Sequence, residues 1–173
     1  YPGVVVTVTE TGTSFEYDLR DPLLSTADAD ALATVEEYFA DAHVDRPHTR
    51  EGAIERVEAG LDEKHQRVIG RLVDCSPAAR RRLDYHALCS LACFGELTPY
   101  ALDDRIDVAD LGEECVRVHT DDFAPAETDL DPETPFLDRF ASERLEQHTV
   151  PFHEFEIPVI VYRENLLGDD PFS

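Results

Sequence analysis

The chain has 173 residues, 42% of them hydrophobic, and carries 38 Asp and Glu against 15 Lys and Arg, for a formal net charge of −23. The hydrophobic content excludes a disordered segment, and the acidity excludes a nucleic-acid-binding surface, which has to be basic. No stretch approaches the roughly 18 consecutive apolar residues that a membrane-spanning helix needs, so no membrane insertion is expected.

The charge predicts a halophilic protein. Solubility needs only roughly 2–8 units of net charge in a small domain, and Lys64 is the only lysine among the fifteen basic residues. Such an excess of acid is self-repelling in dilute buffer, whereas concentrated salt shortens the Debye length to about 3 Å at 1 M. The chain begins with Tyr1 and contains no methionine, which predicts a piece of a longer chain.

The first forty residues predict a β-hairpin followed by a helix. Residues 4–9 are β-branched and apolar, residues 15–19 alternate apolar and acidic, and Gly12 lies between them. These are the patterns of two strands joined by a short turn. Ser25 predicts the N-cap of a helix that extends to Phe39, and residues 41–49 form a connector.

Two further helices are predicted in the middle of the chain. Apolar residues recur at helical spacing over 50–73, which indicates one amphipathic helix. Ser76 and Pro77 then begin a helix over 77–93, and Gly95 ends it. Arginines 80–82 lie in the first turn of that helix, where they are interpreted as solvated.

The last third is predicted to contain strands with a loop and a short helix between them. Strands are expected at 106–108, 115–119 and 159–162, an ordered loop at 123–135 and a helix at 136–145. The fold class is therefore α+β: an N-terminal β-hairpin and three to four helices packed on a small mixed sheet, with no RecA core. Residues 1–130 are expected to form the main domain, and 131–173 a helix-strand extension.

No catalytic or cofactor-binding constellation is present in the sequence. A phosphate-binding loop needs Gly-Lys-Ser/Thr, but Lys64 lies between Glu63 and His65. The spacings G-x-G-x-x-G, G-x-S-x-G and H-E-x-x-H are also missing. This stretch of chain is therefore expected not to be an enzyme. Adjacent acids such as Asp103 and Asp104 are expected from composition alone and are interpreted as solvated.

The cysteines are the remaining candidate site. Cys89 and Cys93 share one face of the predicted helix and His86 lies one turn earlier, so with Cys75 or Cys115 they form a conceivable tetrahedral Zn²⁺ set. Their apolar neighbours instead favour small buried core residues. No metal is expected, and the zinc site is kept as the alternative.

Four segments carry a family resemblance. They are YDLRDPLL at 17–24, LDYHAL at 83–88, FGELTPYALDDRI at 94–106 and VRVHTDDF at 116–123, followed by Thr128. In this order they resemble the N-terminal region of archaeal type II/IV secretion ATPases, the motors that assemble type IV pili and archaella. The similarity covers about residues 15–130 and the strand at 157–163. The sequence departs from the family pattern at 106–111 and at Thr120, where the family has an arginine.

The resemblance implies a non-catalytic N-terminal module that supports hexamer assembly and transmits force in the cytoplasm, at the membrane secretion machinery. Its implied partners are a RecA-like ATPase domain and the pilus platform membrane protein. ATP and Mg²⁺ are expected only in the ATPase domain, so this chain needs no cofactor. The alternative is a halophilic interaction domain or standalone adaptor without nucleotide chemistry, which binds another protein through the apolar strand at 157–163.

Overall fold

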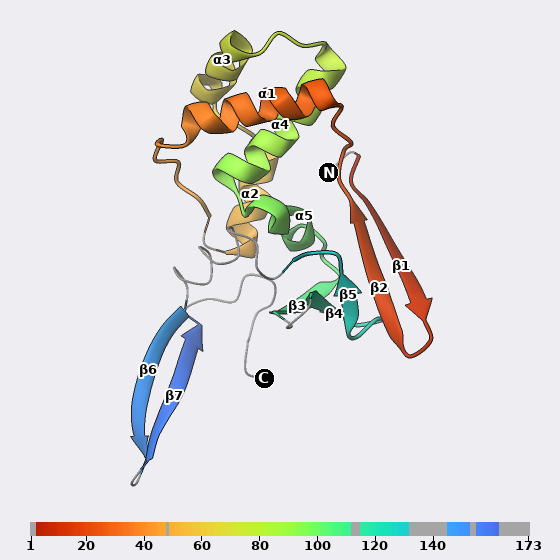
Figure 1. Cartoon of the computed structure of the whole chain (residues 1–173), viewed down its shortest axis with the longest axis vertical. Helices are drawn as coiled ribbons and strands as arrows, with labels where there is room; N and C mark the ends of the chain where they lie inside the picture. The colour runs from red at the N-terminus through yellow and green to blue at the C-terminus, as the bar shows by residue number, and fades with distance from the viewer. Residues whose placement is uncertain (1–2, 48, 112–114, 132–144, 153–154, 163–173) are drawn as a thin grey trace.

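A computed structural model describes residues 3–47, 49–111, 115–131, 145–152 and 155–162. The protein is α+β, as predicted (Figure 1). Its helices are α1 Thr26–Phe39, α2 Arg50–Ala59, α3 Glu63–Leu72, α4 Pro77–Ala92 and α5 Thr98–Ala101, with a 3₁₀ turn η1 at Gly95–Leu97. Its strands are β1 Val5–Thr11, β2 Ser14–Arg20, β3 Ile106–Leu111, β4 Val116–Thr120, β5 Ala126–Thr128, β6 Leu145–Phe152 and β7 Phe155–Tyr162.

The sheet has five strands in the order β1-β2-β5-β4-β3. Its β2–β5 pair is parallel and its other pairs are antiparallel, so the sheet is mixed. Strands β6 and β7 form a separate antiparallel pair. Figure 1 shows α1, α3 and α4 gathered at one end of the molecule, with α5 beside β3, β4 and β5.

The predicted N-terminal hairpin is confirmed. A two-residue turn joins β1 to β2, and Gly12 in that turn has a φ of 70°, a conformation that L residues with a Cβ rarely adopt. On β2 the apolar face is inward, and Tyr17 there is only 1% exposed. The hairpin therefore contributes one side of the sheet's core.

The predicted helix starts at Ser25 and Ser76 are also confirmed. The Ser25 hydroxyl accepts from the Asp28 N–H while the Asp28 carboxylate accepts from the Ser25 N–H, which completes a capping box. The Ser76 hydroxyl caps α4, with Pro77 at a position that needs no amide donor. These caps satisfy backbone groups that the helix itself leaves unpaired.

The prediction of one helix over 50–73 is wrong. The chain forms α2 and α3 with a break at Gly60, whose φ is 72°. The Asp62 carboxylate then accepts from the His65 N–H and begins α3 as a new helix. The break redirects the chain, so that Ala53 of α2 lies in the sheet core and Ile69 of α3 lies in the helical core.

Other boundaries also differ from the predictions. Helix α4 ends at Ala92, and Gly95 begins η1 instead of closing α4. The predicted loop at 123–135 contains β5, which lies between β2 and β4 in the sheet. Most of the predicted helix at 136–145 falls outside the described residues, but Leu145 itself belongs to β6. The last predicted strand is confirmed within β7.

Two groups of buried side chains form the core. One joins the sheet to α2, η1 and α5, and the other joins α1, α3 and α4. The first core contains Tyr17, Ala101 and Ile106, and the polar contacts beside it form the candidate site.

Candidate functional site

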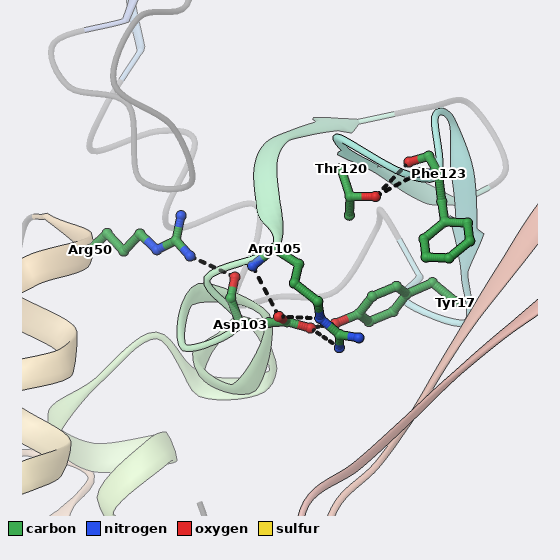
Figure 2. Close-up of polar contacts among 6 residues, drawn as sticks. All are labelled: Tyr17, Arg50, Asp103, Arg105, Thr120 and Phe123. Carbon is green, nitrogen blue, oxygen red and sulfur yellow. Dashed lines mark hydrogen bonds and ion pairs between the residues drawn. The ribbon is translucent and has the colours of Figure 1, made fainter.

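A polar network joins the sheet to the helices, and we call it the junction network. Its members are Tyr17 on β2, Arg50 at the start of α2, and Asp103 and Arg105 between α5 and β3 (Figure 2). Tyr17 and Arg105 are 88 positions apart in the sequence, so only the fold brings them together. The contacts of Tyr17 and Arg50 therefore depend on tertiary structure, whereas the Asp103–Arg105 pair is local.

The Asp103 carboxylate is the centre of the network, and its side chain is only 9% exposed. It accepts a hydrogen bond from the Tyr17 hydroxyl. It also accepts from Arg105 through Nε at 2.8 Å, through NH2 at 2.5 Å and through the backbone N–H at 3.1 Å. A charge-assisted pair of this two-pronged form fixes geometry as well as charge.

The Arg50 side chain binds the backbone of the turn that contains Asp103. Its guanidinium donates to the carbonyl oxygens of Ala101 at 3.0 Å, Asp103 at 2.5 Å and Ile106 at 2.8 Å. These three acceptors lie at the end of α5, in the following turn and at the start of β3. One side chain of α2 therefore fixes the path by which the chain passes from the helices into the sheet.

A second set of contacts joins the end of β2 to α4. The Tyr85 hydroxyl donates to the Asp21 carboxylate at 2.6 Å, and the His86 Nε2 lies 2.7 Å from the Pro22 carbonyl oxygen. Nearby, the Arg82 guanidinium pairs with the Asp28 carboxylate at 2.5 Å. Hydrogen bonds and an ion pair thus join α4 to the β2–α1 connection and to the first turn of α1.

Three buried tyrosines each donate a hydrogen bond to an aspartate carboxylate. Tyr17 donates to Asp103, Tyr85 to Asp21, and Tyr100 to Asp129 at 3.1 Å. Desolvation by burial raises the pKa of each of these phenols, and the neighbouring carboxylate raises it further, with Cys89 also contributing at Tyr85. All three are therefore neutral hydrogen-bond donors at any physiological pH.

Asp103 and Arg105 of the junction network are also held in their ionised states. Burial opposes ionisation of Asp103, but hydrogen bonds from Arg105 and Tyr17 outweigh it and bring its pKa to about 2. The hydrogen bonds to Asp103 raise the pKa of Arg105. Proton transfer near pH 7 needs a group whose pKa lies near 7. The pKa values of Asp103 and Arg105 both lie far from 7.

The turn between β4 and β5 is closed by Thr120 and Phe123 (Figure 2). The Thr120 hydroxyl donates to the Phe123 carbonyl oxygen at 3.0 Å and accepts from the Phe123 N–H at 2.8 Å. The Phe123 ring lies edge-on to Phe15 of β2, with centroids 5.3 Å apart. These contacts bring β5 back beside β2.

The structure does not gather the five candidate zinc ligands. Cys89 and Cys93 are buried, while Cys75 and Cys115 are partly exposed. His86 lies against the Pro22 carbonyl oxygen. Among the described residues, which include these five, no group of three or more His, Cys, Asp or Glu is placed to hold a metal ion. Burial raises the pKa of Cys89 to about 12 and that of Cys93 to about 11, so both thiols stay protonated.

Two predictions of solvated charge are wrong. Asp103 is a buried hub of the network, whereas its neighbour Asp104 is exposed. Arg80 pairs with Asp84 at 2.6 Å and Arg82 pairs with Asp28, so two of the three arginines in α4 are structural. Arg105, two residues away, is a local partner of Asp103, but no local pattern marks the contact of Asp103 with Tyr17, which lies 86 residues away.

A shallow open groove of about 380 Å³ lies between the end of α1, the following connector and α4. Its lining mixes apolar and charged side chains: Glu36, Phe39, His43, Val44, Arg46 and Leu91. Arg46 donates across it to the Ser90 carbonyl oxygen at 2.8 Å. The groove is thus lined by both acidic and basic side chains, so its charge favours neither an anionic nor a cationic ligand.

Comparisons with known proteins give no family assignment. No family model matches the chain. No curated protein matches it either. None of the helices in the described residues is both long enough and apolar enough to cross a membrane.

Proposed function

We propose that this chain is the non-catalytic N-terminal module of a type II/IV secretion ATPase, which supports assembly of a hexameric motor and transmits its movement. In this role the module has to move as one body, because a soft joint would absorb displacement instead of passing it on. The observation that carries the proposal is the junction network, which joins β2, α2 and the α5–β3 turn.

The segments that resemble the family meet at these contacts. Tyr17 and Asp21 belong to the first segment, Tyr85 to the second and Asp103 to the third. The Tyr85–Asp21 and Tyr17–Asp103 hydrogen bonds therefore join residues from separate resembling segments. This coincidence supports the proposal, because a resemblance by chance has no reason to fall on residues that contact one another.

The proposal places nucleotide chemistry outside the chain. ATP and Mg²⁺ would bind a RecA-like domain encoded downstream or separately, and the pilus platform membrane protein would be the second partner. The pKa values of Tyr17 and Asp103 are both displaced away from neutral pH, which supports a structural role for these two residues in the junction network.

The test compares Asp103→Asn with Asp104→Asn in the complete motor. The first change removes the carboxylate that Tyr17 and Arg105 share, and the second alters an exposed neighbour with the same loss of charge. We expect Asp103→Asn to reduce appendage assembly roughly tenfold or more while ATP hydrolysis by the ring continues. Asp104→Asn should leave both unchanged. The isolated chain should not hydrolyse ATP.

Three results would contradict the proposal. They are ATP hydrolysis by the isolated chain, a motor that assembles appendages equally well after this module is deleted, and a reading frame and neighbouring genes without any ATPase domain. Capture of a partner unrelated to a motor at molar KCl would favour the alternative of a standalone adaptor.

A further inference from the structure

Strand β1 leaves one of its edges unpaired within the described part of the chain. It is the terminal strand of the five-stranded sheet, and β2 is its one partner there. Figure 1 shows β1 on the outer side of the hairpin. A seven-residue strand in this position presents a row of backbone donors and acceptors that another strand can pair with.

The register of the hairpin identifies these free groups. The two-residue turn closes on the Thr11–Ser14 pair, which in such a turn exchanges both backbone hydrogen bonds. Pairs alternate along an antiparallel ladder, so Val5, Thr7 and Thr9 also bond to β2. The N–H and C=O groups of Val6, Val8 and Glu10 therefore point toward the open edge.

The opposite edge of the sheet is protected in ways that β1 is not. Strand β3 has a register shift between Ile106 and Val108, and it carries the exposed acid Asp107. Bulges and charges are the devices by which proteins block unwanted strand pairing. Strand β1 pairs with β2 in unbroken register and has a single charge, Glu10, near its end.

The charge pattern also singles out this edge. Residues 1–9 contain no charged side chain, and the one longer uncharged run in the sequence, 85–95, lies mostly in the buried face of α4. Strand β1 also displays apolar surface, because Val5 is 56% exposed. An uncharged strip offers nothing to attract a basic partner, but it is where two acidic copies can approach.

We propose that β1 pairs with β1 of a second copy of this chain, in antiparallel orientation about a twofold axis at Thr7. This inference goes beyond the proposed function and does not depend on it. A twofold contact uses the same patch on both copies, so the strand has to be complementary to itself.

The register centred on Thr7 meets this condition. It places Val6 opposite Val8 of the second copy, and this pair exposes its backbone groups to each other. Val4, which precedes β1, comes opposite Glu10. Thr7 then faces Thr7, and Val5 faces Thr9, as the alternating non-hydrogen-bonded pairs. The two Glu10 carboxylates never face each other, so no like charges are directly opposed.

Cysteine cross-linking tests the register directly, in a background where Cys75 and Cys115 are replaced by serine. The proposal puts the two residue-7 Cβ atoms about 5 Å apart, close to the separation of about 4 Å in a disulfide. The two residue-9 positions lie roughly 14 Å apart along the strand. In about 2 M KCl, Thr7→Cys should form a covalent dimer at least about tenfold faster than Thr9→Cys.

A second variant tests the hydrogen bonding without any change in charge. Val8→Pro removes one outward N–H from each copy but none that bonds to β2, so it should weaken the dimer roughly thirtyfold. Circular dichroism checks that the variant stays folded, and light scattering measures its mass. The proposal is overturned if the wild-type chain is a monomer at millimolar concentration in molar KCl, or if Thr7→Cys and Thr9→Cys cross-link equally. It is also overturned if the edge binds a basic peptide, with binding that weakens as salt rises, instead of a second copy.

Discussion

Arg50 donates from its NH2 group to the carbonyl oxygen of Asp103 at 2.5 Å, so the residue whose carboxylate holds Tyr17 is itself held through its backbone. This relationship couples a helix start to a strand of the sheet through one intermediate residue. The junction network can therefore be tested at two positions. A substitution of Arg50 tests its hydrogen-bond geometry, and the pH dependence of stability tests Asp103.

Arg50→Lys should destabilise the chain by about 2–4 kcal/mol, because a lysine ammonium cannot reach the three carbonyl oxygens that the guanidinium fork reaches together. The free energy of unfolding, measured by urea titration in molar KCl, checks this. Arg20→Lys is the matched control, since Arg20 forms an exposed pair with Asp18 and should change stability by less than about 0.5 kcal/mol. Equal effects of the two changes would contradict the role given to Arg50.

The pH dependence of stability should carry a signature of Asp103. Its pKa is about 2 in the folded chain and about 3.9 when unfolded, so its contribution is fully present above pH 4 and is lost as the pH falls toward 2. The contribution is at most on the order of 2 kcal/mol, because Arg105 is 53% exposed and solvent screens part of the pair's attraction. Urea titrations at several pH values should show a flatter acid limb for Asp103→Asn. An unchanged acid limb would refute the assignment.

Two glycines should respond in opposite directions to alanine. Gly60 has a φ of 72° at the break between α2 and α3, so Gly60→Ala should cost about 1 kcal/mol or more. Gly70 lies within α3, where alanine favours the helix by up to about 1 kcal/mol and its Cβ meets only the end of the Arg80 side chain at 3.3 Å. Melting temperatures of both variants provide the comparison. A stabilising Gly60→Ala would mean that the two helices can merge into one.

Thiol labelling should separate the cysteines into two classes. In the folded chain a thiol-specific reagent should modify Cys75 and Cys115 quickly, because they are partly exposed. Cys89 and Cys93 should react only after denaturation, since they are buried and their pKa values are raised to about 12 and about 11. Mass spectrometry of labelled peptides identifies the sites. If added zinc slowed the labelling of Cys75 or Cys115, the result would instead support the metal-site alternative.

Salt should stabilise the chain strongly. A net charge of −23 repels itself, and screening should raise the melting temperature steeply between about 0.1 and 2 M KCl. Sucrose at matched osmolality is the control, because it stabilises by exclusion without screening charge. A melting temperature that follows sucrose and KCl equally would show that the surface acids do not govern stability.

Local signals in the sequence predicted the features that depend on neighbouring residues. The hairpin follows from alternation and Gly12, and the helix starts follow from Ser25 and Ser76, whose partners lie three residues away. The α+β class follows from the order of these elements. Each such feature is decided within a few residues, so its pattern is visible without the fold.

Features that depend on distant partners were missed. The apolar spacing over 50–73 continues across Gly60, so it conceals the break between two helices. Strand β5 has only three residues, too few for alternation to show, and its pairing with β2 supplies its structure. Asp103 became a hub only because the fold buries it beside Tyr17, and in so acidic a chain its identity carries no signal.

The position of β5 has a consequence for how the chain is made. Hairpin β1–β2 is complete once residue 20 has been synthesised, yet its inner edge stays without a neighbour until residues 126–128 emerge about a hundred residues later. Contacts between such distant segments slow the search for the native state. An isolated two-stranded hairpin is at best marginally stable in water, so during this interval the nascent hairpin is the segment that a chaperone would protect best.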